Sequence, residues 1–156
     1  MVVHVVAVGR VRDAALRTAC DEYARRVRRY FRLDIHEVQE AGRRAPDPPA
    51  AQRLEAERLR AAIPPGARCI ALTRAGTLLT GSRALAARVD EWRIAARDVA
   101  VLIGGAYGIA PDLLTSCERL SLSHLTLPHE LARLVWLEQL YRAGTILRGE
   151  PYHKGE

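Results

Sequence analysis

Two short stretches of almost uninterrupted aliphatic residues place the strongest constraint on the fold. Residues 2–8 read Val-Val-His-Val-Val-Ala-Val, and residues 99–103 read Val-Ala-Val-Leu-Ile. Strands that are apolar on both faces are typical of parallel sheets covered by helices on both sides. The first stretch is too short to cross a membrane and has no basic leader, so no membrane segment or export signal is expected. Both stretches are therefore predicted to be buried strands.

Helical and strand patterns alternate along the rest of the chain. Gly and Pro content indicates a loop at residues 40–49, Ser82 is expected to cap a helix, and Pro111 suits a helix's first turn. This alternation predicts one domain over residues 1–156, an α/β fold with a mainly parallel sheet flanked by helices. The expected strands are residues 2–8, 33–38, 68–72, 99–103 and 120–122, and the expected helices are residues 13–30, 50–63, 82–97, 111–118 and 131–147.

The charge balance favours a polyanionic partner. The formal net charge is +6, and of the 24 Lys and Arg residues only Lys154 is a lysine. Arginine suits bidentate contacts with phosphates, so nucleic acid is the expected partner, although biased codon usage in an Ala-rich chain would give the same composition. Further arginines gather at one helix end and in the next loop, where they either grip phosphates or form a solvated helix face: Arg25, Arg26, Arg28, Arg29, Arg32, Arg43 and Arg44.

The cysteines and two of the histidines are expected to have no catalytic or metal-binding role. Cys20, Cys69 and Cys117 are odd in number, far apart and without a CxxC pair, so neither a disulfide framework nor a zinc site is predicted. This pattern indicates a reduced, cytoplasmic protein with no metal. His4 and His36 lie in strand-like runs and are interpreted as structural.

The last predicted helix is apolar almost all the way round. One face of a sheet cannot cover so many apolar side chains, so the helix is either deeply buried or shared with a second subunit. In so small a domain a dimer interface is favoured. The apolar residues are Leu131, Leu134, Val135, Trp136, Leu137, Leu140, Tyr141, Ile146 and Leu147.

Three segments point to a ligand site. The glycine turn of residues 104–108 follows a buried strand, where open α/β sheets bind ligands, although tight packing alone would also require glycine there. Residues 122–127 end at Pro128, and their backbone groups cannot all join a regular ladder. The tail carries Tyr152, His153 and Lys154, which a substrate would order. No hydrolytic triad or carboxylate pair is evident, so the pattern favours a group transfer with a cofactor.

In order and spacing, these motifs resemble the ribosomal RNA large subunit methyltransferase H family, within the SPOUT superfamily of knotted methyltransferases. The resemblance spans nearly the whole chain. It is carried by Val6-Ala7-Val8-Gly9, Leu102-Ile103-Gly104-Gly105, Leu125-Thr126-Leu127-Pro128-His129, Glu138-Gln139-Leu140-Tyr141-Arg142-Ala143 and Pro151-Tyr152-His153-Lys154.

The resemblance implies a methyl transfer from S-adenosylmethionine to N3 of a pseudouridine in 23S rRNA on assembled ribosomes. It also implies a homodimer and a C-terminal trefoil knot, which periodicity could not reveal. The implied donor-binding residues are Leu72, Gly104, Leu122, Ser123, His124, Leu125, Thr126 and Leu127, the implied RNA-binding residues are Arg133, Arg142 and Lys154, and the implied catalytic residues are His129, Tyr152 and His153.

In the catalytic hypothesis the C-terminal tail contacts the target pseudouridine base, which is flipped out of the RNA. Tyr152 and His153 would order over that base, and His153 or His129 would assist removal of the N3 proton. Arg133 or Lys154 would balance charge. The sequence departs from related chains at Thr73, Thr77 and residues 106–107. Two other functions stay open, a knotted methyltransferase acting on transfer RNA or another rRNA site and a non-catalytic ribosome-binding factor.

Overall fold

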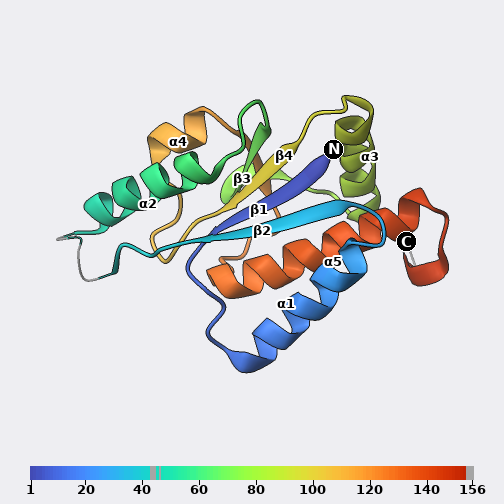
Figure 1. Ribbon diagram of the computed structural model, residues 1–156, viewed down its shortest axis with the longest axis horizontal. Helices are drawn as coiled ribbons and strands as arrows, with labels where there is room; N and C mark the ends of the chain where they lie inside the picture. The colour runs from blue at the N-terminus through green and yellow to red at the C-terminus, as the bar shows by residue number, and fades with distance from the viewer. Residues whose placement is uncertain (43–44, 46, 154–156) are drawn as a thin grey trace.

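The computed structural model describes residues 1–42, 45 and 47–153, with only the backbone of His153 included. Strands and helices alternate as expected (Figure 1). The elements are β1 (Val2–Val8), α1 (Ala14–Val27), β2 (Arg32–Val38), α2 (Pro48–Ala62), β3 (Arg68–Leu78), α3 (Ser82–Ile94), β4 (Val99–Ile103), α4 (Pro111–Thr115), β5 (Glu118–Ser121), α5 (His129–Leu147) and the short 3-10 helix η2 (Pro151–His153).

The five strands form one sheet in the order β2-β1-β4-β3-β5, and every neighbouring pair is parallel. Helices α2 and α4 cover one face, whereas α1, α3 and α5 pack on the other (Figure 1). The predicted parallel α/β fold is therefore confirmed. The predicted knot and the single-domain assignment stay predictions. No described helix combines the length and the apolar character that crossing a membrane requires.

The two hydrophobic cores explain why β1 is apolar along almost its whole length. Val3, Val5 and Ala7 face the core beneath α1, α3 and α5, and Val6 and Val8 face the core beneath α2 and α4. Successive side chains of a strand point to opposite faces, so a strand covered on both sides needs apolar residues at every position. His4 is the exception, and it is still buried.

Several helix ends differ from the predicted boundaries for local reasons. Asp13 caps α1 by accepting a hydrogen bond from the backbone N–H of Leu16, so the helix proper starts one residue later than expected. Gly81 is the N-cap of α3 instead of Ser82, whose hydroxyl donates to Oε1 of Gln139 at 2.8 Å and ties α3 to α5. Helix α4 ends at Thr115, because β5 already begins at Glu118.

Strand β3 is longer than predicted because its pairing with β5 resumes after an irregularity between Leu72 and Thr77. A Cβ atom at Gly76 would lie 2.6 Å from the carbonyl carbon of Leu120, so no side chain fits where the two strands cross. Residues 73 and 74 are displaced from the regular ladder by this irregularity, and they line the pocket described below.

A disulfide joins Cys69 to Cys117 and corrects the expectation of three reduced cysteines. Ile70 is paired with Glu118 in the parallel ladder of β3 and β5, so the residues just before them are also adjacent, with Cα atoms 4.7 Å apart. The 48-residue separation hid this contact from sequence reasoning. Cys20 is a free, buried cysteine.

Candidate active site

A pocket of about 370 Å³ opens at the carboxyl ends of β3 and β4 and beside the segment that follows β5. This is the edge of an open parallel sheet where ligands generally bind. It brings together most of the residues that the resemblance assigned to donor binding, and it adds one residue assigned to catalysis, His129. Those residues are Leu72, Gly104, Leu122, Ser123, Leu125, Thr126, Leu127 and His129, whereas His124 is not among the lining residues.

The glycine turn after β4 is closely packed. A Cβ atom at Gly104 would lie 2.7 Å from the carbonyl carbon of Gly108, so only glycine fits there. Gly108 has a positive φ of 77° and donates its N–H to the carbonyl of Gly105 at 3.0 Å. Steric packing thus explains these glycines, and the compact turn also leaves space for a ligand beyond the end of β4.

The loop of residues 122–127 forms the wall of the pocket and is rich in available backbone groups. Within the part of the chain that the structure describes, these residues make no hydrogen bond to other backbone groups. Ser123 organises the loop locally, because its hydroxyl accepts from the N–H of Leu125 at 3.0 Å and its carbonyl accepts from the Ser121 hydroxyl at 2.9 Å. The remaining N–H and C=O groups are suited to bind a polar, planar ligand.

His129 places an imidazole at the rim of the pocket and is the first residue of α5. Pro128 is the N-cap and makes no side-chain capping bond, so the first N–H groups of α5 have no capping partner there. A helix start carries a partial positive charge and favours anionic groups nearby. The rim therefore combines a proton acceptor with a site suited to a carboxylate.

Tyr152, in the tail, lies away from this pocket within one subunit. Its hydroxyl donates to Oε1 of Glu138 at 3.2 Å, and its ring packs edge-on against Tyr141 with centroids 4.6 Å apart. Glu138 follows His129 by nine residues, which is about 14 Å along a helix axis. Figure 1 shows the tail at the far end of α5 from the start of that helix. The structure thus does not bring together the predicted catalytic groups within one chain.

The surroundings of Tyr152 raise the pKa of its phenol. Burial is the main cause, and a hydrogen bond with Tyr23 and the negative charge of Glu138 act in the same direction. The neutral phenol can therefore stack or donate a hydrogen bond, but it does not serve as a phenolate near neutral pH. Only the backbone of His153 is described, and Lys154 lies outside the described residues. Arg43 and Arg44 of the predicted basic loop also lie outside them.

The structure corrects the predicted RNA contact of Arg133. Its side chain is 3% exposed, with Nη1 on the Glu37 carboxylate and Nη2 donating to the carbonyl of Gly9 at 2.7 Å. A guanidinium held inside the protein in this way ties α5 to β1 and β2 and does not reach a phosphate. Arg142 bonds to Glu138 at 2.7 Å and lies over the ring of Tyr152, 4.8 Å from its centroid.

Two features of the site were missed by sequence reasoning. Thr73 and Arg74 line the pocket through the irregularity in β3, and no local signal marks that irregularity. A larger cleft of about 770 Å³ lies beside residues 9–12 and 37–42, where Arg12 pairs with Glu40 at 3.0 Å. None of the predicted donor-binding residues lines that cleft. The pocket of about 370 Å³ is therefore the better candidate for the donor site, although it is the smaller of the two.

The arginines near the end of α1 are largely engaged within the protein. Both Arg25 and Arg26 bond to the Glu22 carboxylate at 2.7 Å. Arg28 donates to the carbonyl of Leu33 at 3.4 Å. These contacts favour the interpretation that the arginines form a solvent-exposed helix end, neutralised by neighbouring groups of the protein, over the interpretation that they bind phosphates.

Comparison with known proteins agrees with this geometry. The family described as "Predicted SPOUT methyltransferase" matches residues 1–153. Ribosomal RNA large subunit methyltransferase H of Anaeromyxobacter dehalogenans strain 2CP-C is 50% identical over 155 residues, covering 99% of this chain and all of that protein. The protein of the same name from Gemmatimonas aurantiaca is 44% identical over the same shares.

A solved structure supports the fold independently. TrmJ from Z. mobilis ZM4 superposes with a TM-score of 0.51 at 15% identity, covering 91% of this chain and 69% of that one. At this identity the likeness bears on the fold alone. The full-length matches to curated methyltransferases carry the assignment, and they agree with the motifs from which the resemblance was recognised. The chain therefore belongs to the ribosomal RNA large subunit methyltransferase H family of SPOUT methyltransferases.

Proposed function

We propose that this enzyme transfers a methyl group from S-adenosylmethionine to N3 of a pseudouridine in 23S rRNA, acting on assembled ribosomes in the cytoplasm. The observation that carries the proposal is the pocket at the strand ends, with its glycine turn and a loop whose backbone groups make no hydrogen bond to other backbone groups of the described residues. The names of the full-length relatives supply the class of RNA.

The residues present fit the donor. The cavity of about 370 Å³ lies within the range of small-molecule pockets, roughly 300–1,000 Å³. Backbone N–H and C=O groups of residues 122–127 would hold the adenine edge, while Leu72 and Leu122 contribute apolar walls. The start of α5 favours the carboxylate of the amino-acid part. When bound, S-adenosylmethionine supplies an electrophilic methyl group on a sulfonium.

The chain's own chemical task is to handle a proton. N3 of pseudouridine is an imide nitrogen, and it must lose its proton as its lone pair forms the new N–C bond while the C–S bond of the donor breaks. His129 lines the pocket and carries an imidazole that can accept this proton. A positioned general base contributes roughly 10²–10⁴-fold, so His129→Asn is expected to slow transfer on that scale.

A homodimer would complete the site. Within one subunit the tail lies at the far end of α5 from His129, so Tyr152 and His153 would reach the base from the partner subunit. Helix α5 keeps a partly exposed apolar stripe, formed by Leu131, Leu134 and Val135, that a second copy would cover. In this arrangement the pseudouridine base would lie between the pocket of one subunit and the tail of the other, and the ring of Tyr152 would stack on it.

The test is methyl transfer from isotope-labelled S-adenosylmethionine to ribosomes that lack this modification, with the label located by mass spectrometry of rRNA fragments. Label on N3 of a pseudouridine is expected. Label only on transfer RNA or at another rRNA site would overturn the substrate, and ribosome binding without any transfer would favour a non-catalytic factor.

Two matched variants test the donor pocket. Leu125 is 75% exposed and lines the pocket, whereas Ile94 is 72% exposed at the end of α3 and does not line it. Leu125→Arg puts a long cation on the wall of a pocket proposed to bind a positively charged sulfonium compound, and it is expected to weaken donor binding by about tenfold, or about 1.4 kcal/mol. Ile94→Arg is expected to bind the donor normally in equilibrium dialysis. Equal affinities would remove this pocket from donor binding.

A further inference from the structure

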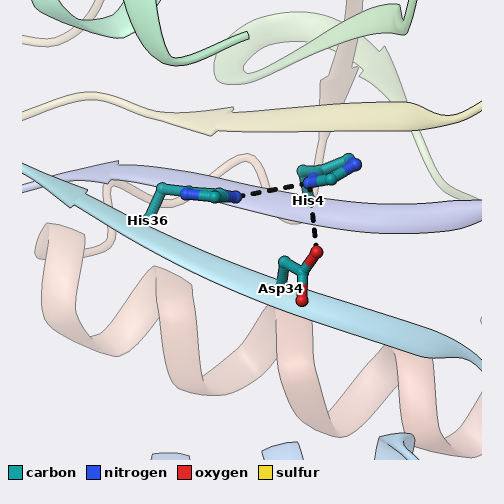
Figure 2. A group of neighbouring side chains, drawn as sticks. All are labelled: His4, Asp34 and His36. Atoms are coloured by element: carbon teal, nitrogen blue, oxygen red, sulfur yellow. Dashed lines mark hydrogen bonds and ion pairs between the residues drawn. The ribbon is translucent and has the colours of Figure 1, made fainter. Parts of the chain in front are cut away.

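Three potential metal ligands converge on one face of the sheet (Figure 2). They are not among the residues that line the pocket. His4 lies on β1, and Asp34 and His36 lie on β2. His4 is paired with Asp34 in the parallel ladder, and His36 is two residues further along, so all three side chains share a face. Nδ1 of His4 lies 3.3 Å from Nε2 of His36 and 3.7 Å from Oδ2 of Asp34.

The buried member of this cluster makes the arrangement unusual. His4 is 8% exposed, and its Nε2 has no hydrogen-bond partner among the described residues. The nearest charged group to that nitrogen is Asp98, whose Oδ2 lies 3.9 Å away while its Oδ1 accepts from the N–H of Val2 at 2.7 Å. A buried ring nitrogen without a partner costs free energy unless something else satisfies the ring.

The anions around the two rings favour a cation at this place. Nδ1 of His4 lies 3.7 Å from the Asp34 carboxylate, and Nε2 of His4 lies 3.9 Å from the Asp98 carboxylate. A cation bound to Nδ1 of His4 and Nε2 of His36 would face the Asp34 carboxylate and would leave the His4 proton on Nε2, toward Asp98.

We propose that this cluster binds one divalent transition-metal ion of the zinc type, with His4, Asp34 and His36 as its three protein ligands. Two donors bound tetrahedrally at 2.0–2.1 Å are about 3.3 Å apart, which is the separation of the two histidine nitrogens. Imidazole and carboxylate together suit zinc and its neighbours. Coordination through Nδ1 places the His4 proton on Nε2, which faces the Asp98 carboxylate 3.9 Å away, and ligating histidines of metal sites commonly have a carboxylate on that side.

The site is accessible to an ion from solvent. The Asp34 side chain is 59% exposed, so an ion can enter and water can complete its coordination. The bound ion would join β2, an edge strand of the sheet, to its neighbour β1. This proposal goes beyond methyl transfer and does not depend on it, and it departs from the sequence-based expectations of no metal and of purely structural histidines.

The test is binding of Co²⁺ and Zn²⁺ by the metal-free protein. One equivalent of Co²⁺ is expected to give the intense visible absorption of a tetrahedral site and to be displaced by Zn²⁺. His36→Gln and Asp34→Asn each remove one proposed metal ligand. Each is expected to lower the affinity for Co²⁺ by more than about 100-fold, the largest effect usually seen when a residue that only contacts a ligand is changed. Asp98→Asn is expected to lower affinity by about tenfold.

Matched controls separate this site from chance binding. His124→Gln and Asp21→Asn change exposed residues of the same types elsewhere, and they are expected to bind the ion as the unchanged protein does. Nitrogen NMR of the unchanged protein gives a second readout that needs no variant, because Zn²⁺ should shift the ring resonances of His4 and His36 first. Absence of a one-to-one complex, or equal affinity in His36→Gln, would overturn the proposal.

Discussion

The pH dependence of stability depends in part on one partly buried phenol, that of Tyr30. Its hydroxyl donates to the Glu150 carboxylate, and burial, followed by this hydrogen bond, raises its pKa from 10.0 to about 12. The folded protein therefore holds this proton more tightly than the unfolded chain does. The resulting stability is fully present below pH 10 and is lost as the pH rises from 10 toward about 12.

Tyr30→Phe is accordingly expected to lower stability at neutral pH and to flatten its decline above pH 10. The measurement is the free energy of unfolding in urea across this pH range. Tyr107→Phe is the matched control, because that side chain is 54% exposed, and its profile should follow the unchanged protein. An equally steep decline in Tyr30→Phe would show that other groups cause the alkaline loss.

At the scale of single residues, the roles assigned to Leu72, Gly104 and His129 stay predictions, but these residues line one pocket although they are far apart in the chain. Sequence reasoning could not place Arg133, because a sequence shows an arginine's charge but not whether a carboxylate and a carbonyl enclose it. Tyr152 was expected to be ordered by a substrate, whereas Glu138 and Tyr141 of the same chain hold it, and its distance from the pocket depends on the length and direction of α5.

Arg133 ties α5 to β1 and β2, so replacing it is expected to lower the stability of the fold. Arg133→Met leaves the carbonyl of Gly9 and the Glu37 carboxylate without their partner. Breaking a buried pair costs roughly 3–5 kcal/mol, and the lower end applies because the Glu37 side chain is 35% exposed. Arg12→Met removes an ion pair whose arginine is 75% exposed and should cost under about 1 kcal/mol. Comparable losses in urea unfolding would contradict the buried-link role.

The disulfide between β3 and β5 predicts a specific thiol count. Cys20 is the free cysteine, and burial raises the pKa of its thiol, so it should react slowly in the folded protein. Alkylation in denaturant without reductant is expected to label Cys20 alone, whereas prior reduction should expose Cys69 and Cys117 as well. Mass spectrometry counts the labels. Labelling of all three without reduction would show that the two strands pair without a covalent link.

Elements whose signal is local were predicted well, and elements that depend on distant partners were not. The continuous apolar runs of β1 and β4 are properties of short segments, and both strands lie where expected. The second half of β3 forms only because Thr77 and Leu78 pair with β5, more than 40 residues later. The same long-range pairing places Cys69 beside Cys117. No window of neighbouring residues contains that information.

The pocket and the tail, the two parts of the proposed site, lie at different places along α5, and if both act on one base this separation requires a second subunit. The pocket lies at the helix start, and Tyr152 is held near Glu138 and Tyr141, farther along the helix. Two copies related by a two-fold axis with antiparallel α5 helices would place each tail near the other's pocket. In that arrangement a single chain contains no complete site, so activity should fall on dilution below the dimer's dissociation constant.

Mixed dimers test this arrangement directly. His129→Asn removes the proposed general base from the pocket and Tyr152→Ala removes the proposed stacking ring from the tail, so each variant alone is expected to be strongly impaired. A heterodimer purified through two different tags has one site with both defects and one site with neither, provided that each site combines the pocket of one subunit with the tail of its partner. It should therefore recover about half of the unchanged activity. If pocket and tail acted within one chain, both sites of the heterodimer would carry a defect, and no recovery would occur.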